Sequence, residues 1–156
     1  MSQIATAYIV SGDLLNRLGE TARRGEISKV GTLLASGGLC VLPEYEYSGS
    51  VLAVVIDYAE EQGLPLPLNQ DTQGANQLIH SDATLVLCAA YTDADSFLTA
   101  LRALPSNEDE LAEYFEAFAE ETWDEAGAAM QAGLAFLRQA FEQLQRPDEW
   151  LLLFIG

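Results

Sequence analysis

Hydrophobic residues near the two ends of the chain form short runs, interrupted only by Thr6 in the first, that are typical of buried β-strands. The first run covers residues 4–10 and the last covers residues 150–155. The first strand is expected to be covered on both faces or nearly so, and the last is long enough to join the core of a sheet. A third extended segment is predicted at residues 39–42, before Pro43. We expect these three segments to form one small sheet.

Apolar residues at steps of three and four predict two helices after the first strand. Ser11 stands where a helix N-cap is expected, and the helix that follows should end near Gly25, where two arginines and a glycine suit a helix C-terminus. A second helix is predicted over residues 27–35, with Gly37 and Gly38 after it.

The strongest helical pattern lies in the C-terminal half. A helix capped by Thr92 or Asp93 is expected to end at Pro105, and a capping-box-like sequence at residues 106–109 opens the next helix. Its apolar stripe, which includes Phe118, continues to residue 144 and exceeds an average helix, so a break is predicted at residues 123–127. Pro147 is expected to end the pattern.

Three segments between these elements are harder to interpret. Residues 51–58 are rich in valine but continue into a polar stretch that stops at Gly63, so a helix, with Ser50 as a possible cap, is favoured over a strand. Residues 64–77 contain two prolines and are predicted to be a loop. The apolar run at residues 84–91 favours a strand.

These elements predict a single globular α+β domain over residues 1–156, mostly helical, with a small mixed sheet that includes the N-terminal and C-terminal strands. The composition agrees with this prediction, because 49% of the 156 residues are hydrophobic. A chain of this length and composition buries enough apolar surface to fold on its own.

Charge narrows the classes of function that the chain can serve. The sequence has 24 acidic and 7 basic residues, which gives a formal charge of -17 at pH 7. A field of this sign repels nucleic acids and anionic membranes and attracts cationic surfaces. We therefore expect no nucleic-acid or membrane partner, and a basic protein as the natural partner.

The acidic residues are concentrated in the predicted helix after Pro105. Nine carboxylates fall within residues 108–125, and no basic residue lies between Arg102 and Arg138. Like charges one helical turn apart repel each other, so this face is either a solvated surface or one that a basic partner neutralises. The candidate binding residues on it are Glu110, Glu113, Glu116, Glu120, Glu121 and Asp124.

A second candidate surface lies in the tyrosine-rich connection at residues 43–50. Two glutamates alternate there with two tyrosines, namely Glu44, Tyr45, Glu46 and Tyr47. Aromatic area beside negative charge suits the recognition of arginine or lysine. The same alternation is also typical of a half-buried strand end with both tyrosines turned inward, and the sequence does not separate the two.

The sequence contains no pattern that predicts a catalytic centre, a metal site or a cofactor. His80 is the only histidine, and its neighbours Ser81 and Asp82 are consecutive, which excludes the geometry of a catalytic triad. The alternating pair Asp93 and Asp95 matches a helix cap better than a calcium loop.

The two cysteines, Cys40 and Cys88, lie in apolar runs where a thiol usually behaves as a small buried hydrophobe. Whether they pair is left open. The first residues carry no basic region or cleavage site of a secretory signal, so the cytoplasm is the expected location.

We expect a non-catalytic acidic binding protein that neutralises a basic partner, in the manner of a bacterial immunity or inhibitor protein facing a toxin enzyme. Two other classes stay open. One is a carboxylate-based hydrolase, with or without a divalent metal ion. The other is a housekeeping domain whose charge only maintains solubility.

Overall fold

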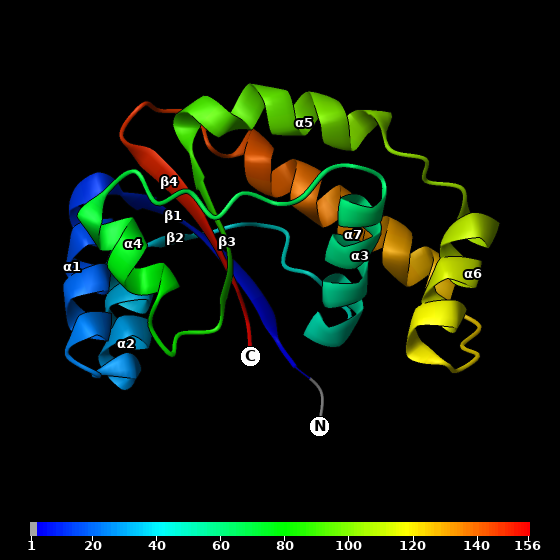
Figure 1. The fold of residues 1–156 in the computed structure, drawn as a ribbon, viewed down its shortest axis with the longest axis horizontal. Coiled ribbons are helices and arrows are strands. Elements are labelled where there is room, and N and C mark those ends of the chain that lie inside the picture. The colour runs from blue at the N-terminus through cyan, green and yellow to red at the C-terminus, as the bar shows by residue number, and fades with distance from the viewer. Residues whose placement is uncertain (1–2) are drawn as a thin grey trace.

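The computed structural model describes residues 3–156, in which four strands form one sheet with helices on both faces (Figure 1). The strands are β1 (Ala5–Ser11), β2 (Leu39–Cys40), β3 (Leu85–Ala90) and β4 (Glu149–Ile155). The α-helices are α1 (Gly12–Arg23), α2 (Ile27–Gly37), α3 (Gly49–Glu61), α4 (Gln73–Ile79), α5 (Ala94–Ala103), α6 (Glu108–Ala119) and α7 (Ala126–Glu142). A short 3-10 turn, η1 (Tyr91–Asp93), precedes α5.

The strand order is β2-β1-β4-β3, and every pair of neighbouring strands is antiparallel. The predicted α+β class and the three predicted strands are confirmed, and β3 joins them as the fourth. The sheet is antiparallel where a mixed sheet was expected. The helices between β3 and β4 return the chain to the end of the sheet where β3 stops, since Ala90 pairs with Trp150. A single parallel bridge from Leu68 to Cys88 lies outside the named strands.

Alternate side chains of the central strands enter two separate cores. Ile9 and Leu153 face α3, α5, α6 and α7, whereas Val10 and Leu152 face α1, α2 and α4. Figure 1 shows the two groups of helices on opposite sides of the strands. The central strands are therefore buried on both faces, as predicted for the first of them.

The first two helices form as the local sequence predicts. The Ser11 hydroxyl accepts a hydrogen bond from the backbone N–H of Leu14 at 3.1 Å, and Gly25 adopts a φ of 77° just after α1. Segment 51–58 is helical, as expected, but α3 is capped by Ser48 and not by Ser50. The cap moves because the Ser48 hydroxyl accepts from the N–H of Ser50.

Helix α4 corrects the prediction that residues 64–77 form a loop. The Thr72 hydroxyl caps it by accepting from the N–H of Ala75 at 3.1 Å. The helix is short and polar, and it forms where Gly19 and Gly74 let the backbones of α1 and α4 come into contact. A Cβ atom on Gly74 would lie 2.5 Å from the Cα atom of Asn16, closer than real atoms approach.

The long C-terminal helical pattern is divided in two, as predicted, although the break begins earlier than residue 123. Glu120 takes a left-handed φ of 56° and ends α6, and α7 begins at Ala126. The cap of α6 is Asn107, whose side chain accepts from the N–H of Glu110 at 3.1 Å. Helix α7 ends at Glu142, before Pro147.

Candidate functional site at the acidic end

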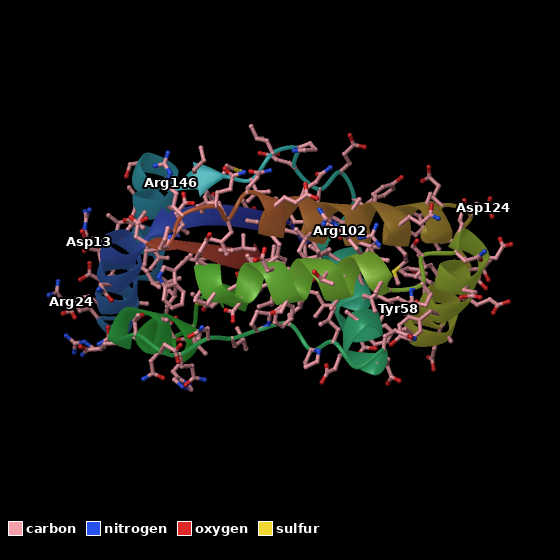
Figure 2. All side chains as sticks on the ribbon, turned by 90° about the horizontal axis from the view of Figure 1, so that it is seen from above. Asp13, Arg24, Tyr58, Arg102, Asp124 and Arg146 are labelled. Carbon is pink, nitrogen blue, oxygen red and sulfur yellow. The ribbon has the colours of Figure 1, made fainter. Side chains whose placement is uncertain are left out.

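Most of the cations lie at one end of the long axis of the molecule, and the densest cluster of carboxylates lies at the other. Four of the seven basic residues belong to the hairpin of α1 and α2, and all nine carboxylates of residues 108–125 belong to α6 and the connection that follows it. Figure 2 shows Arg24 and Asp124 at the two extremes. The acidic end therefore forms a surface of one sign.

Helix α6 lies against α7 and the C-terminal part of α3, with its carboxylates outward. Leu111 and Phe115 are its fully buried side chains. Glu110 and Glu113 are exposed, and Glu116 is half-buried. The predicted division of α6 into an apolar and an acidic face is thus present for these residues.

The connection between α6 and α7 continues this surface. Glu120, Glu121 and Asp124 are exposed, whereas Trp123 turns inward and is half-buried. The Trp123 ring lies 5.6 Å from the ring of Phe115. This aromatic contact holds the connection against the helix, so its carboxylates stay on the outside.

The tyrosine-rich loop packs beside the same end of the molecule. The Tyr45 hydroxyl donates to the carbonyl of Ala129 at 2.9 Å, and the Tyr47 ring lies 6.0 Å from that of Trp123. Both tyrosines are half-buried, while Glu44 and Glu46 are exposed. The tyrosines turn inward, as in the second interpretation, although residues 44–47 form a loop and not a strand end. Burial raises the pKa of Tyr45. The two acidic segments, far apart in sequence, thus meet through Tyr47 and Trp123.

An aromatic pair in the last turns of α6 was not anticipated. Phe118, expected within the buried stripe, has 53% of its surface exposed. It stacks on Tyr114 with ring centroids 6.4 Å apart and an interplanar angle of 17°. Phe118 is exposed because α6 ends at the left-handed Glu120, beyond the edge of the core. In the sequence, only the nearness of Phe118 to the end of the helix could have indicated that its ring is exposed.

Tyr114 joins this aromatic pair to α3. Its hydroxyl donates a hydrogen bond to the Asp57 carboxylate. Burial, the hydrogen bond to Asp57 and the negative charges of Glu61 and Glu60 raise the pKa of Tyr114. The exposed glutamates of α3 therefore lie close enough to Tyr114 to extend the acidic surface beyond α6.

The other candidate residues from the sequence, Asp93 and His80, lie outside the acidic surface. The Asp93 carboxylate accepts from the N–H of Ala90 at 2.7 Å, which ties η1 to β3. His80 is exposed. Within residues 3–156, no three His, Cys, Asp or Glu side chains cluster closely enough to hold a metal ion.

The cysteines lie on strands at opposite edges of the sheet and are both free thiols. Cys88 is buried, as expected, and burial raises the pKa of its thiol to about 12. Cys40 is only half-buried, and its sulfur lies 3.8 Å from a carboxylate oxygen of Glu44. Their placement on separate edge strands excludes a disulfide between them within the folded chain.

The hydrolase alternative requires two carboxylates that face a hollow. One hollow, of about 380 Å³ between η1, α5 and the end of α7, is lined by Asp95 and Glu142. Both residues are exposed, and Glu142 accepts from the Arg102 guanidinium at 3.1 Å. This arrangement neither buries a carboxylate nor frees both for acid and base roles.

No known protein family and no curated protein matches the chain in sequence. The fold is similar to that of a solved structure, the protein of unknown function YfbM from Escherichia coli. The two share 13% sequence identity with a TM-score of 0.59, over 98% of this chain and 99% of that one. The likeness shows a shared fold with a bacterial protein. Over residues 3–156, none of the helices is long and apolar enough to cross a membrane.

Proposed function

We propose that this protein is a non-catalytic binding protein of the cytoplasm that neutralises a basic protein partner through its acidic end. The observation that carries the proposal is the exposed, single-sign surface of α6 and the connection after it. In that surface Glu110, Glu113, Glu120, Glu121 and Asp124 are exposed. None of the ion pairs among residues 3–156 involves a carboxylate of this surface.

An uncompensated surface of this kind costs stability. Each pair of like charges one turn apart on a helix is unfavourable by about 0.2–0.5 kcal/mol. A surface needed only for solubility mixes charges of both signs. A cationic partner removes the repulsion, and long-range attraction between the two proteins accelerates their association.

Phe118 supplies the apolar contact that charge alone lacks. An exposed aromatic ring that is already stacked on Tyr114 loses little freedom on binding. Binding energy in interfaces concentrates in a few such aromatic residues, surrounded by polar groups. Tyr45 and Tyr47, which are turned inward, support the loop in this proposal, while Glu44 and Glu46 contribute charge.

A toxin enzyme with a cationic active-site cleft is the class of partner that fits best. Such a cleft is shaped for a polyanion, and a rigid helix with closely spaced carboxylates and a flanking aromatic ring resembles that polyanion. In this form the protein acts as an immunity or inhibitor protein that blocks the cleft by occupying it.

The test is affinity capture from a lysate of the source organism at low salt, followed by stepwise salt elution and mass spectrometry. We expect one stoichiometric basic protein that elutes at intermediate salt. The triple variant Glu113→Gln, Glu116→Gln, Glu120→Gln should release it at lower salt, and Phe118→Ala should weaken the complex without changing the salt dependence.

The matched control is Asp13→Asn, Asp82→Asn, Asp148→Asn, which removes the same number of negative charges at exposed positions elsewhere. Its complex should keep most of its salt resistance. Equal loss in both triple variants would mean that binding follows net charge and not this surface. Failure to retain any basic protein would end the proposal and turn attention to small substrates.

A further inference from the structure

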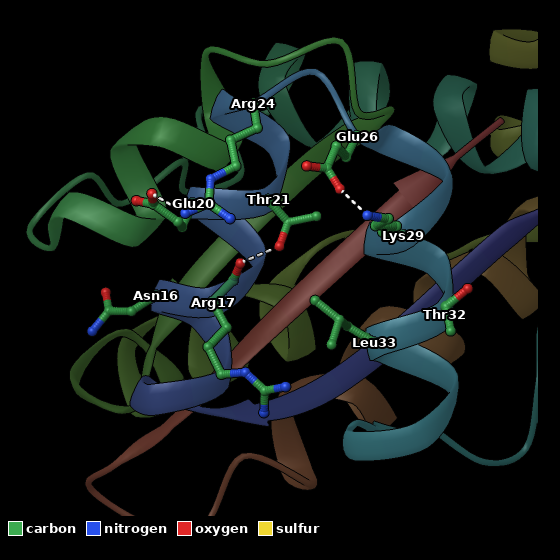
Figure 3. A pocket seen from close by; sticks show the side chains of 9 residues that line it. All are labelled: Asn16, Arg17, Glu20, Thr21, Arg24, Glu26, Lys29, Thr32 and Leu33. Atoms are coloured by element: carbon green, nitrogen blue, oxygen red, sulfur yellow. Dashed lines mark hydrogen bonds and ion pairs between the residues drawn. The ribbon is translucent and has the colours of Figure 1, made fainter.

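The opposite end of the molecule contains a groove between α1 and α2, about 730 Å³ in volume. Figure 3 shows the side chains of Arg17 and Leu33 between the two helices, with Glu20 and Arg24 at one side and Glu26 and Lys29 at the other. This volume lies within the range of small-molecule sites in proteins.

Most charges around the groove already have partners. Glu20 accepts from Arg23 at 2.8 Å and from Arg24 at 3.1 Å, and Lys29 lies 2.5 Å from Glu26. The ion pairs found among residues 3–156 do not include Arg17. Its guanidinium therefore stands as a cation whose donors are open to a ligand.

The hydroxyl groups at the groove are used within their own helices. Thr21 donates to the carbonyl of Arg17 at 2.7 Å, and Thr32 donates to the carbonyl of Ser28 at 3.4 Å. What the groove offers a ligand is Leu33, the alkyl stems of the basic side chains and one guanidinium. These groups combine apolar surface with the one positive charge of the groove that has no ion-pair partner among residues 3–156.

We infer that this groove binds a small amphiphilic monoanion, a carboxylate with an aliphatic body. The carboxylate would pair with both nitrogens of the Arg17 fork, and the hydrocarbon would lie against Leu33 and the alkyl stems. The surrounding charge favours this place for an anion, because the hairpin of α1, α2 and their connection, residues 12–37, has four cations against three carboxylates. The inference does not depend on the function proposed for the acidic end.

The experiment is a titration of the full-length protein with octanoate, followed by amide chemical shifts in 1H-15N NMR spectra. We expect saturable shifts confined to α1 and α2. Arg17→Gln should weaken binding about tenfold, which is the usual loss when one charge-assisted hydrogen-bonded pair is removed. Leu33→Ala should weaken it as well, by shortening the apolar floor.

The matched control is Arg102→Gln, which removes an exposed arginine from α5 and leaves the groove unchanged. It should bind octanoate as the wild type does, and octanamide, which lacks the charge, should bind the wild type about tenfold more weakly than octanoate does. Shifts that never saturate, shifts centred on Phe118 instead of the groove, or unchanged binding by Arg17→Gln would each overturn the inference. The spectra themselves report whether each variant is folded.

Discussion

Glutamate side chains have opposite electrostatic surroundings at the two ends of the molecule. In the α1–α2 hairpin, Glu20 and Glu26 each lie within ion-pair distance of a cation on the next helical turn. At the acidic end, the charged residues nearest to Glu113 and Glu120 in the sequence are all carboxylates. A glutamate therefore adds a favourable interaction to one helix and an unfavourable one to the other.

The two ends also differ in the contacts that attach their helices to the rest of the molecule. Helices α1 and α4 meet backbone to backbone through Gly19 and Gly74, so the α1 end is fixed by close packing. Helix α6 is fixed by Leu111, Phe115 and a chain of aromatic contacts through Trp123. Packing of apolar side chains at the acidic end offsets a repulsion that the other end does not have.

The largest effect should come from filling the contact between α1 and α4. Gly74→Ala places a methyl group against the backbone of Asn16, so we expect a loss of about 1–3 kcal/mol or more in the free energy of unfolding. Urea denaturation measures it. Gly31→Ala, on α2 with nothing within 4 Å of the new Cβ, should instead stabilise the protein by about 0.5–1 kcal/mol. An unchanged midpoint for Gly74→Ala would contradict the close approach.

A smaller loss should follow when the acidic end loses the link between α6 and α3. Tyr114→Phe removes the hydrogen bond to Asp57 and keeps the stack with Phe118. We expect the free energy of unfolding to fall by about 1–2 kcal/mol, since the acceptor is charged but half-buried. Urea denaturation at neutral pH measures the change. A variant as stable as the wild type would mean that water replaces the hydroxyl fully.

Alkaline pH should weaken the fold through Tyr114 and two other side chains. The pKa values of Tyr45, Tyr114 and Cys88 are raised, so these groups stay protonated in the folded protein where the unfolded chain ionises. Their contribution is complete below the unfolded pKa and is lost as the pH rises towards the folded value, which for Cys88 means from 9.0 to about 12. Urea midpoints across this range should fall, and less steeply in Tyr114→Phe. A midpoint independent of pH would refute this assignment.

The smallest effects should have opposite signs at the two ends. Glu113→Gln, Glu116→Gln and Glu120→Gln together remove mutual repulsion and should leave the free energy of unfolding unchanged or raise it by a few tenths of a kcal/mol per pair of like charges. Glu20→Gln removes two ion pairs and should lower it slightly. Thermal midpoints of both variants at low and high salt measure these effects. Because salt screens repulsion and attraction alike, each difference from the wild type should shrink at high salt. Clear destabilisation of the triple variant would show that the face is not solvent-exposed.

Local sequence was enough to predict most elements of the fold. The apolar runs that form β1 and β4, the Ser11 cap and the break within the acidic helical pattern all depend on neighbouring residues. Helix α4 was missed because its seven residues carry a weak pattern, and it is stabilised by contact with α1. Phe118 belongs to the apolar stripe by its spacing, but whether a residue of the stripe is buried depends on which neighbouring helices cover it.

The sequence by itself determined the net charge of -17, the helical nature of the acidic segment and the absence of compensating cations along it. These properties follow from composition and from spacing within a few residues. Only the tertiary structure decided that Tyr45 and Tyr47 turn inward, that Tyr47 meets Trp123, and that most of the cations gather at the far end from α6. Those outcomes depend on contacts between segments distant in the chain, which the sheet order and the packing of the helices select.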